Sequence, residues 1–247
     1  DSSGIASSSV IKAVEAGVDV VDLAISSLSG CTSQPNLNSV VHALGNAPRS
    51  TGLDVVALNQ LSIYWEAVRQ YYSPFDTSPP FGSAEVFQHQ MPGGQYTNLR
   101  EQAGALGLGK RWPDVVTTYR ECNRILGDIV KVTPSSKSVG DLAIFLITKG
   151  VKPEDLINLP EETGFPQSVI DLLSGNLGKP KGGWPKEVQK VILGKQKPMK
   201  GRPGASAPKM DLKKEKISLL KQFGKHCTDD DLFCSVTVSY THLRAHE

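Results

Sequence analysis

The 247-residue chain has few cysteines, few aromatic residues and almost no net charge. Its four cysteines stand far apart, a spacing that predicts neither a disulfide framework nor a cysteine-rich metal site. We therefore expect free thiols in a reducing, intracellular compartment. The 27 basic and 25 acidic residues nearly balance, although basic residues cluster late in the chain. We interpret that cluster as solvated loops and expect no nucleic-acid partner, because the interleaved aromatic residues that such a surface needs lie elsewhere. No apolar run approaches the roughly 20 residues that span a membrane, and no glycine-rich phosphate-binding loop is present.

The first 46 residues have the order helix, strand, helix. Residues 5–16 place apolar side chains at helical spacing, and Gly17 follows as a stop signal. Residues 18–26, VDVVDLAIS, are rich in β-branched residues and apolar on both faces, which is typical of a buried parallel strand. The stretch NLNSVVHALG then predicts a second short helix. This order indicates one α/β unit of a larger α/β fold.

From about residue 47 onward the pattern is mostly helical. Residues 79–98 are rich in proline and glycine and predict a long loop. Other stretches have apolar residues at helical spacing, and the last two of them carry Pro near the start and Gly at the end, as helices commonly do. These stretches are LNQLSIYWEAVRQYY, PDVVTTYRECNRILGDIVKV, SKSVGDLAIFLITKG, FPQSVIDLLSG and WPKEVQKVILG.

The stretch KVTPSSKSVGD (131–141) puts several hydroxyls and a lysine where one predicted helix ends and the next begins. Thr133 followed by Pro134 predicts an N-cap with proline at the first helical position. Capping accounts for Thr133 and one serine. It does not account for Lys137, because the start of a helix carries partial positive charge. Amides, hydroxyls and an ammonium group on one turn also suit a carboxylate or an enolate, and the residues alone leave both interpretations open.

Four blocks of sequence resemble the carboxyltransferase region of the biotin-dependent pyruvate carboxylase family, and they occur in the family's order. The blocks are AGVDVVDLAISSLSGCTSQP (16–35), MPGGQYTNL (91–99), VTPSSKSVGDLAIFL (132–146) and GRPGAS (201–206). The resemblance runs from the opening DSSGIASSSV to about residue 225. The carboxyltransferase subunits of oxaloacetate decarboxylase and transcarboxylase contain the same region and are an alternative. GRPGAS and the opening residues favour the pyruvate carboxylase family.

The resemblance implies an α/β fold that forms the C-terminal end of a TIM-type (β/α)8 barrel, followed by a mostly α-helical funnel. In such barrels the active site lies at the C-terminal ends of the strands. Four regions are expected. They are the last helix–strand–helix part of a barrel truncated at its N-terminus (1–46), the helical funnel or conserved carboxylase region (47–225), a weakly matching end (226–237), and VSYTHLRAHE (238–247), which resembles a translated sequencing adapter.

By the same resemblance, the protein moves a carboxyl group from carboxybiotin to pyruvate and gives oxaloacetate, a step of anaplerosis and gluconeogenesis. Thr133 is implied to be the catalytic residue, which relays a proton between the two substrates. Ser136 and Lys137 are implied to bind biotin, which would explain a lysine at the start of a helix. The paired glycines of MPGGQYTNL permit a tight turn or a close approach, and this block is assigned no chemical step.

The resemblance also implies biotin on a separate carrier domain and a divalent metal ion, zinc or manganese, that polarises pyruvate. The family's metal ligands would lie upstream of Asp1, so none is expected in this chain. The lone histidines His42 and His89 are interpreted as structural. ATP would be used by the full-length enzyme only.

We expect the chain by itself to be inactive and the full-length enzyme to be a homo-oligomer. Its location would be the mitochondrial matrix in a eukaryote and the cytoplasm otherwise. A non-catalytic helical binding module is an alternative from another class, because the sequence holds no complete metal or nucleophile site.

Overall fold

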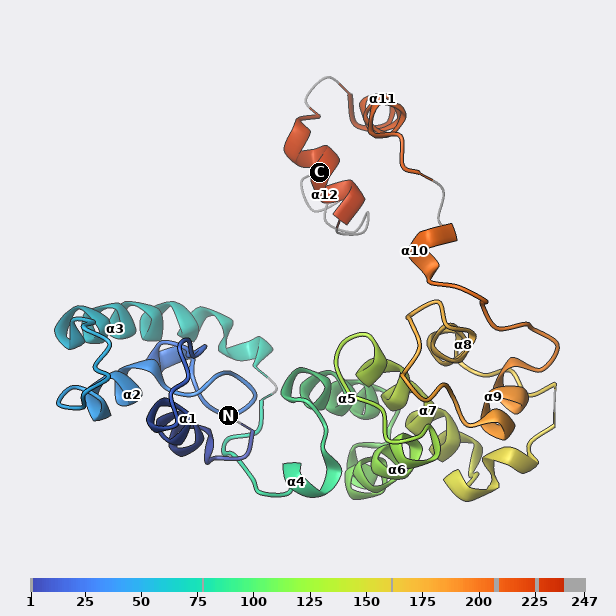
Figure 1. Ribbon diagram of the computed structural model, residues 1–247, viewed down its shortest axis with the longest axis horizontal. Helices are drawn as coiled ribbons and strands as arrows, with labels where there is room; N and C mark the ends of the chain where they lie inside the picture. The colour runs from blue at the N-terminus through green and yellow to red at the C-terminus, as the bar shows by residue number, and fades with distance from the viewer. Residues whose placement is uncertain (1, 77, 161, 207–208, 225–226, 238–247) are drawn as a thin grey trace. The chain divides into compact units, whose positions relative to one another are not determined.

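The computed structural model describes residues 2–76, 78–160, 162–206, 209–224 and 227–237 (Figure 1). The regular secondary structure of these residues is helical, and the chain divides into two units, Asp1–Arg202 and Pro203–Glu247. The first unit contains α1 (Ala6–Glu15), α2 (Leu37–Ala43), α3 (Val55–Tyr72), α4 (Val86–His89), α5 (Gly93–Ala105), α6 (Trp112–Ile125), α7 (Ser135–Lys149), α8 (Gln167–Ser174) and α9 (Lys186–Leu193). The second contains α10 (Pro203–Ser206), α11 (Leu212–Phe223) and α12 (Asp229–Thr237).

The helices α1 and α2 pack together through a small apolar cluster of Val14, Val40 and Leu44. The side chain of Asn36 begins α2 by accepting a hydrogen bond from the amide of Ser39 at 3.0 Å. This N-cap satisfies an amide that has no partner within the helix. Both helices predicted for the first 46 residues are therefore confirmed.

The strand predicted at residues 18–26 is wrong for the described residues. The segment makes a single parallel bridge, between Ala24 and Asn36, and the 3-10 helix η1 (Ser26–Leu28) follows at once. Val20, which a buried strand would cover, is 79% exposed. Parallel strands are stabilised by strand neighbours and by helices on both faces, and no further strand lies beside this segment in the described parts of the chain.

The 18-residue helix α3 has no buried side chain. Asp54 caps its start by accepting hydrogen bonds from the amides of Val56 and Ala57, at 2.8 and 3.3 Å. Large apolar side chains are exposed along the helix, among them Leu61, Ile63, Tyr64, Tyr71 and Tyr72. The cap and the helix's own backbone hydrogen bonds therefore define α3 more than burial does.

The main apolar core of the first unit lies among helices α5 to α9 (Figure 1). Every third or fourth residue of α6 faces this core, and the side chains of Val115, Tyr119 and Cys122 are fully buried. The next helix, α7, contacts α5, α6 and α8 and is buried over most of its length. The amphipathic helices predicted from the spacing of apolar residues are confirmed for this part of the chain.

The long loop predicted at residues 79–98 is wrong over its second half, which contains α4 and the beginning of α5. Pro92 is the N-cap residue of α5, and Gly93 and Gly94 form its first turn. Proline is tolerated at a helix start, because the first amides of a helix have no acceptor within it. These residues therefore begin a helix where the sequence pattern indicated a loop.

Proline and glycine bound the helices α8 and α9 as expected. Pro166 and Pro185 are their N-cap residues, and Gly175 and Gly194 follow their last residues with positive φ. Gly150 likewise ends α7 with a φ of 69°. Glycine adopts this left-handed conformation without a steric penalty, which is why it commonly ends helices.

In the second unit, Asp211 caps α11 by accepting hydrogen bonds from the amides of Lys213 and Lys214. The weakly matching end expected at 226–237 includes α12, and the adapter-like tail expected at 238–247 lies outside the described residues. None of the helices described in either unit is long and apolar enough to cross a membrane.

Candidate functional site: the turn before α7

The hydroxyl-rich turn before α7 is closed by Ser135. Its Oγ lies 2.6 Å from the carbonyl oxygen of Val132 and 2.9 Å from that of Val130, and it accepts a hydrogen bond from the amide of Val132. Pro134 is the N-cap residue, and the Thr133–Pro134 peptide bond is cis. The predicted N-cap at Thr133 is therefore wrong, because Thr133 lies one residue too early and its exposed side chain makes no cap hydrogen bond.

The structure places Ser136 and Lys137 on the first turn of α7, next to Thr133 in the chain but in different surroundings. Ser136 is 2% exposed, and its amide donates to the carbonyl of Val132 at 3.3 Å. The Lys137 side chain is 64% exposed, and its Nζ lies 2.5 Å from Asp141 Oδ2. The turn thus combines an exposed hydroxyl, a buried serine and a lysine that is already paired.

A hydrogen-bond network involving Asp141 supports Lys137 from the core side. Asp141 is 9% exposed, and its Oδ2 also accepts a hydrogen bond from Ser168 Oγ at 2.5 Å. Ser138 Oγ donates to the carbonyl of Ser168 at 2.9 Å. These contacts join the first two turns of α7 to the first turn of α8. Sequence reasoning missed them, although the spacing of four residues between Lys137 and Asp141 is that of helical ion pairs.

Lys131 anchors the segment that leads into the turn. Its Nζ donates to Gln90 Oε1 at 3.0 Å and, with the Asn123 amide oriented to suit both of its neighbours, to Asn123 at 2.9 Å. Burial lowers the pKa of Lys131, and the charge of Asp128 opposes that change. Lys131 therefore connects three segments two residues before Thr133.

Helix α5 brings the MPGGQYTNL block against two other blocks. A Cβ atom on Gly93 would lie 2.8 Å from the carbonyl oxygen of Thr32, and Thr97 Oγ1 donates to Thr32 Oγ1 at 3.3 Å. A Cβ atom on Gly140 of α7 would lie 2.5 Å from Gln95 Nε2. Glycine permits both approaches because it has no side chain. The blocks at 16–35, 91–99 and 132–146 therefore meet around α5.

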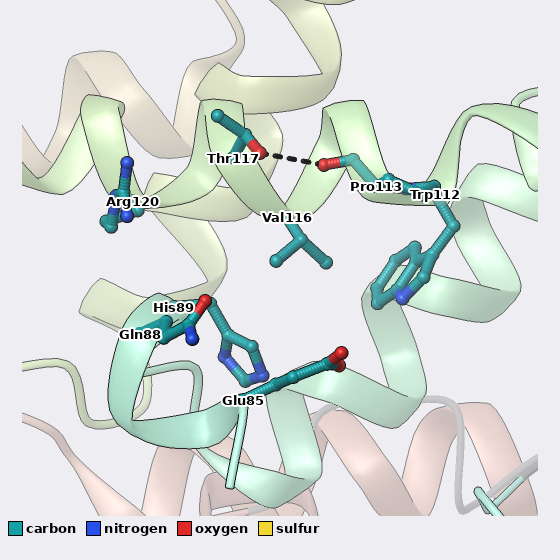
Figure 2. Close-up of a pocket in the computed structure, with 8 residues that line it drawn as sticks. All are labelled: Glu85, Gln88, His89, Trp112, Pro113, Val116, Thr117 and Arg120. Carbon is teal, nitrogen blue, oxygen red and sulfur yellow. Dashed lines mark hydrogen bonds between the residues drawn. The ribbon is translucent and has the colours of Figure 1, made fainter. Parts of the chain in front are cut away.

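A separate pocket of about 220 Å³ lies between α4 and the outer face of α6. Figure 2 shows Val116 and Trp112 on the α6 side, and Glu85 and His89 on the α4 side. His89 is 5% exposed, and its Nδ1 accepts a hydrogen bond from the amide of Met91 at 2.9 Å. Burial lowers the pKa of His89, against the opposing charge of Glu85, so the neutral ring is favoured.

This pocket presents both signs of charge, because Arg120 lines it together with Glu85. The charges of these side chains therefore do not indicate whether the pocket would bind an anion or a cation. None of the sequence-predicted site residues lines it, so it is distinct from the turn before α7.

Among the residues that the structure describes, no group of three or more His, Cys, Asp and Glu side chains is arranged to hold a metal ion. The described residues thus do not fit the zinc or manganese ion that the resemblance implies.

The family model described as a conserved carboxylase domain matches residues 86–240, and the chain belongs to that family. The turn before α7 and the MPGGQYTNL block both lie within the matched residues.

Proteins similar to this chain are pyruvate carboxylases. The chain is 43% identical over 235 residues to pyruvate carboxylase 1 of Caenorhabditis elegans, which covers 94% of the chain and 20% of that protein. The solved carboxyl transferase domain of Rhizobium etli pyruvate carboxylase has a TM-score of 0.92 and 44% identity, over 96% of this chain and 40% of that one. A structure of the same domain with pyruvate and biocytin has a TM-score of 0.90 and 45% identity, over 94% and 39%.

These matches confirm the resemblance to the carboxyltransferase region of the pyruvate carboxylases. The chain spans about a fifth of the length of the curated relatives that it matches.

Proposed function

We propose that this chain forms part of an enzyme that transfers a carboxyl group from carboxybiotin to pyruvate and gives oxaloacetate. The observation that carries the proposal is the likeness, over 94% of the chain, to a carboxyl transferase domain solved with pyruvate and biocytin. In this proposal the chain contributes the end of a TIM-type barrel and most of its helical funnel. The full-length enzyme supplies the carrier domain with its biotin, uses ATP, and acts as a homo-oligomer.

Thr133 is the proton relay in the proposed reaction. Its hydroxyl gives a proton to the biotin ring nitrogen from which the carboxyl group departs, and receives one from the methyl group of pyruvate. The pyruvate carbon then forms the new C–C bond, so the proton count of the threonine is unchanged. The hydrogen bonds of the turn support this role. Ser135 makes the side-chain hydrogen bonds that close the turn, so the exposed Thr133 hydroxyl is not used for capping.

Ser136 and Lys137 hold the biotin ring in the proposed site. A lysine ammonium has three N–H donors, and one of them is used by Asp141, at 2.5 Å. Two donors therefore remain for the ureido oxygen of biotin. Ser136 lies on the same helical turn as Lys137, and its role in binding the same ring is proposed from the family resemblance.

A divalent ion would polarise the carbonyl of pyruvate and stabilise the enolate. Because the described residues offer no ligand cluster, no step of the mechanism is assigned to a metal here. Nothing in the roles of Thr133, Ser136 and Lys137 depends on which ion is bound.

The test is the substitution Thr133→Ala in the full-length protein encoded by the source transcript. Oxaloacetate formation from pyruvate should fall by about 10²- to 10⁴-fold, the loss typical of a missing proton-transfer group. ATP cleavage by the biotin carboxylase reaction should continue. Thr133→Ser retains a hydroxyl and should retain most of the transfer.

Thr148→Ala is the matched control, because Thr148 lies on α7, the helix that follows Thr133, and the partner of its Oγ1 among the described residues is the carbonyl of Ile144, at 2.8 Å. It should leave carboxyl transfer unchanged. Transfer near the wild-type rate in Thr133→Ala would refute the assigned relay, and would favour a non-catalytic role for the turn.

A further inference from the structure

We propose that Asp141 and Ser168 are positioning residues that fix the Lys137 ammonium for the biotin ring. The proposal rests on the proposed function, because Lys137 is taken as a biotin ligand there. The network itself is fully within the described residues. Asp141 Oδ2 accepts one hydrogen bond from Nζ of the exposed Lys137 and one from Oγ of Ser168 on α8, both at 2.5 Å.

The difference in burial between Lys137 and Asp141 indicates which of the two side chains fixes the position of the other. The Lys137 side chain is 64% exposed and flexible by nature, whereas the Asp141 side chain is 9% exposed and lies in the packed contact of α7 with α8. A buried carboxylate with fixed partners cannot follow a mobile lysine. The ammonium is therefore held at a position that Asp141 sets.

Ser168 restrains the carboxylate in turn. It lies on the first turn of α8, where the partial positive charge of the helix start favours an anion. The carbonyl of Ser168 also accepts a hydrogen bond from Ser138, at 2.9 Å, so α8 is attached to α7 at two points. The start of α8 thus fixes the carboxylate, and the carboxylate fixes Lys137.

The ion pair also fits the kind of group that Lys137 would bind. With Asp141 beside it the pair has no net charge, so it offers N–H donors without a general attraction for small anions. The neutral ureido oxygen of biotin needs donors of this kind. A lysine without the carboxylate would bind chloride or bicarbonate more readily. It would also sample several rotamers, so fixing it on biotin would cost side-chain entropy.

A double-mutant cycle on biocytin binding tests the proposal. Calorimetric titration of the full-length protein in its unbiotinylated form, with pyruvate present, would compare the wild type with Lys137→Ala, Asp141→Asn and the double variant. Each single change should weaken biocytin by roughly tenfold, the scale of one charge-assisted hydrogen bond. Asp141→Asn should have no further effect in the Lys137→Ala background, because its action passes through the lysine.

Ser168→Ala in the same cycle provides a second variant that keeps the Asp141 charge, in case Asp141→Asn does not fold. It should weaken biocytin by a smaller factor, and again only when Lys137 is present. Additive effects in the two backgrounds would overturn the proposal, because they would mean that the carboxylate acts on the fold alone. Biocytin binding that Lys137→Ala leaves unchanged would instead refute the role of Lys137 in the proposed function.

Discussion

The two adjacent glycines of α5 should differ sharply in what a methyl group does to them. A Cβ atom on Gly93 would lie 2.8 Å from the carbonyl oxygen of Thr32 and 3.0 Å from Ser2 Oγ, whereas a Cβ atom on Gly94 would meet no described residue within 4 Å. The Ser2 hydroxyl can rotate away, but the carbonyl oxygen belongs to the backbone. Gly93→Ala therefore forces the 30–35 loop away from α5.

The expected magnitude follows from comparing the two substitutions. Both variants gain about 0.4–1 kcal/mol from the lower entropy of the unfolded chain. Gly93→Ala alone carries the overpacking cost of about 1–3 kcal/mol. The difference between the variants is then about 1–3 kcal/mol, which corresponds to roughly 5- to 150-fold in the equilibrium for opening this contact.

Amide hydrogen exchange on the full-length protein measures that opening. Gly30 and Ser33 donate backbone hydrogen bonds within the 30–35 loop, at 2.9 and 2.7 Å. Their exchange should quicken in Gly93→Ala and stay near wild type in Gly94→Ala. Equal exchange in the two variants would refute the reasoning, since it would show that the loop does not rest on α5 at Gly93.

Two further predictions concern stability. Burial lowers the pKa of His89 below its ordinary value of 6.5. At mildly acidic pH the unfolded state therefore binds more protons than the folded state does. The α4–α5 region should be fully stable above about pH 6.5 and lose stability below it. Hydrogen exchange at pH 7.5 and 5.5, corrected for the intrinsic rate, should show this loss, and His89→Gln should remove it. Asp54→Ala should destabilise the start of α3 by about 1 kcal/mol, since two amides lose their acceptor; circular dichroism melts would show the loss, and an unchanged helix would contradict the capping role.

The amphipathic helices could be predicted from the sequence because local signals specify them. Apolar spacing placed α6 and α7, and proline and glycine marked the ends of α8 and α9. The position of a cap was not predictable to one residue. Thr133 has the chemistry of an N-cap, but Pro134 takes that position and Ser135 closes the turn.

The position of the candidate site along the chain was predictable, but the hydrogen bonds that hold its side chains were not. Thr133, Ser136 and Lys137 stand within five residues, so their proximity is a property of the chain itself. Ser168 lies 27 residues beyond Asp141 and follows no spacing rule, and only the packing of α7 against α8 brings its hydroxyl to the carboxylate. Long-range contacts of this kind depend on the tertiary fold, which a local pattern does not specify.

The failed strand at residues 18–26 and the exposed helix α3 have a common physical cause. Apolar periodicity reports which side chains would gain by burial, and burial needs a second surface. Val20 and the aromatic residues of α3 meet no such surface within the described residues, so they stay exposed. The relatives extend well beyond the part that this chain spans. We therefore expect these positions to become protected from hydrogen exchange in the full-length protein, and continued exposure there would show that the sequence pattern at 18–26 has another origin.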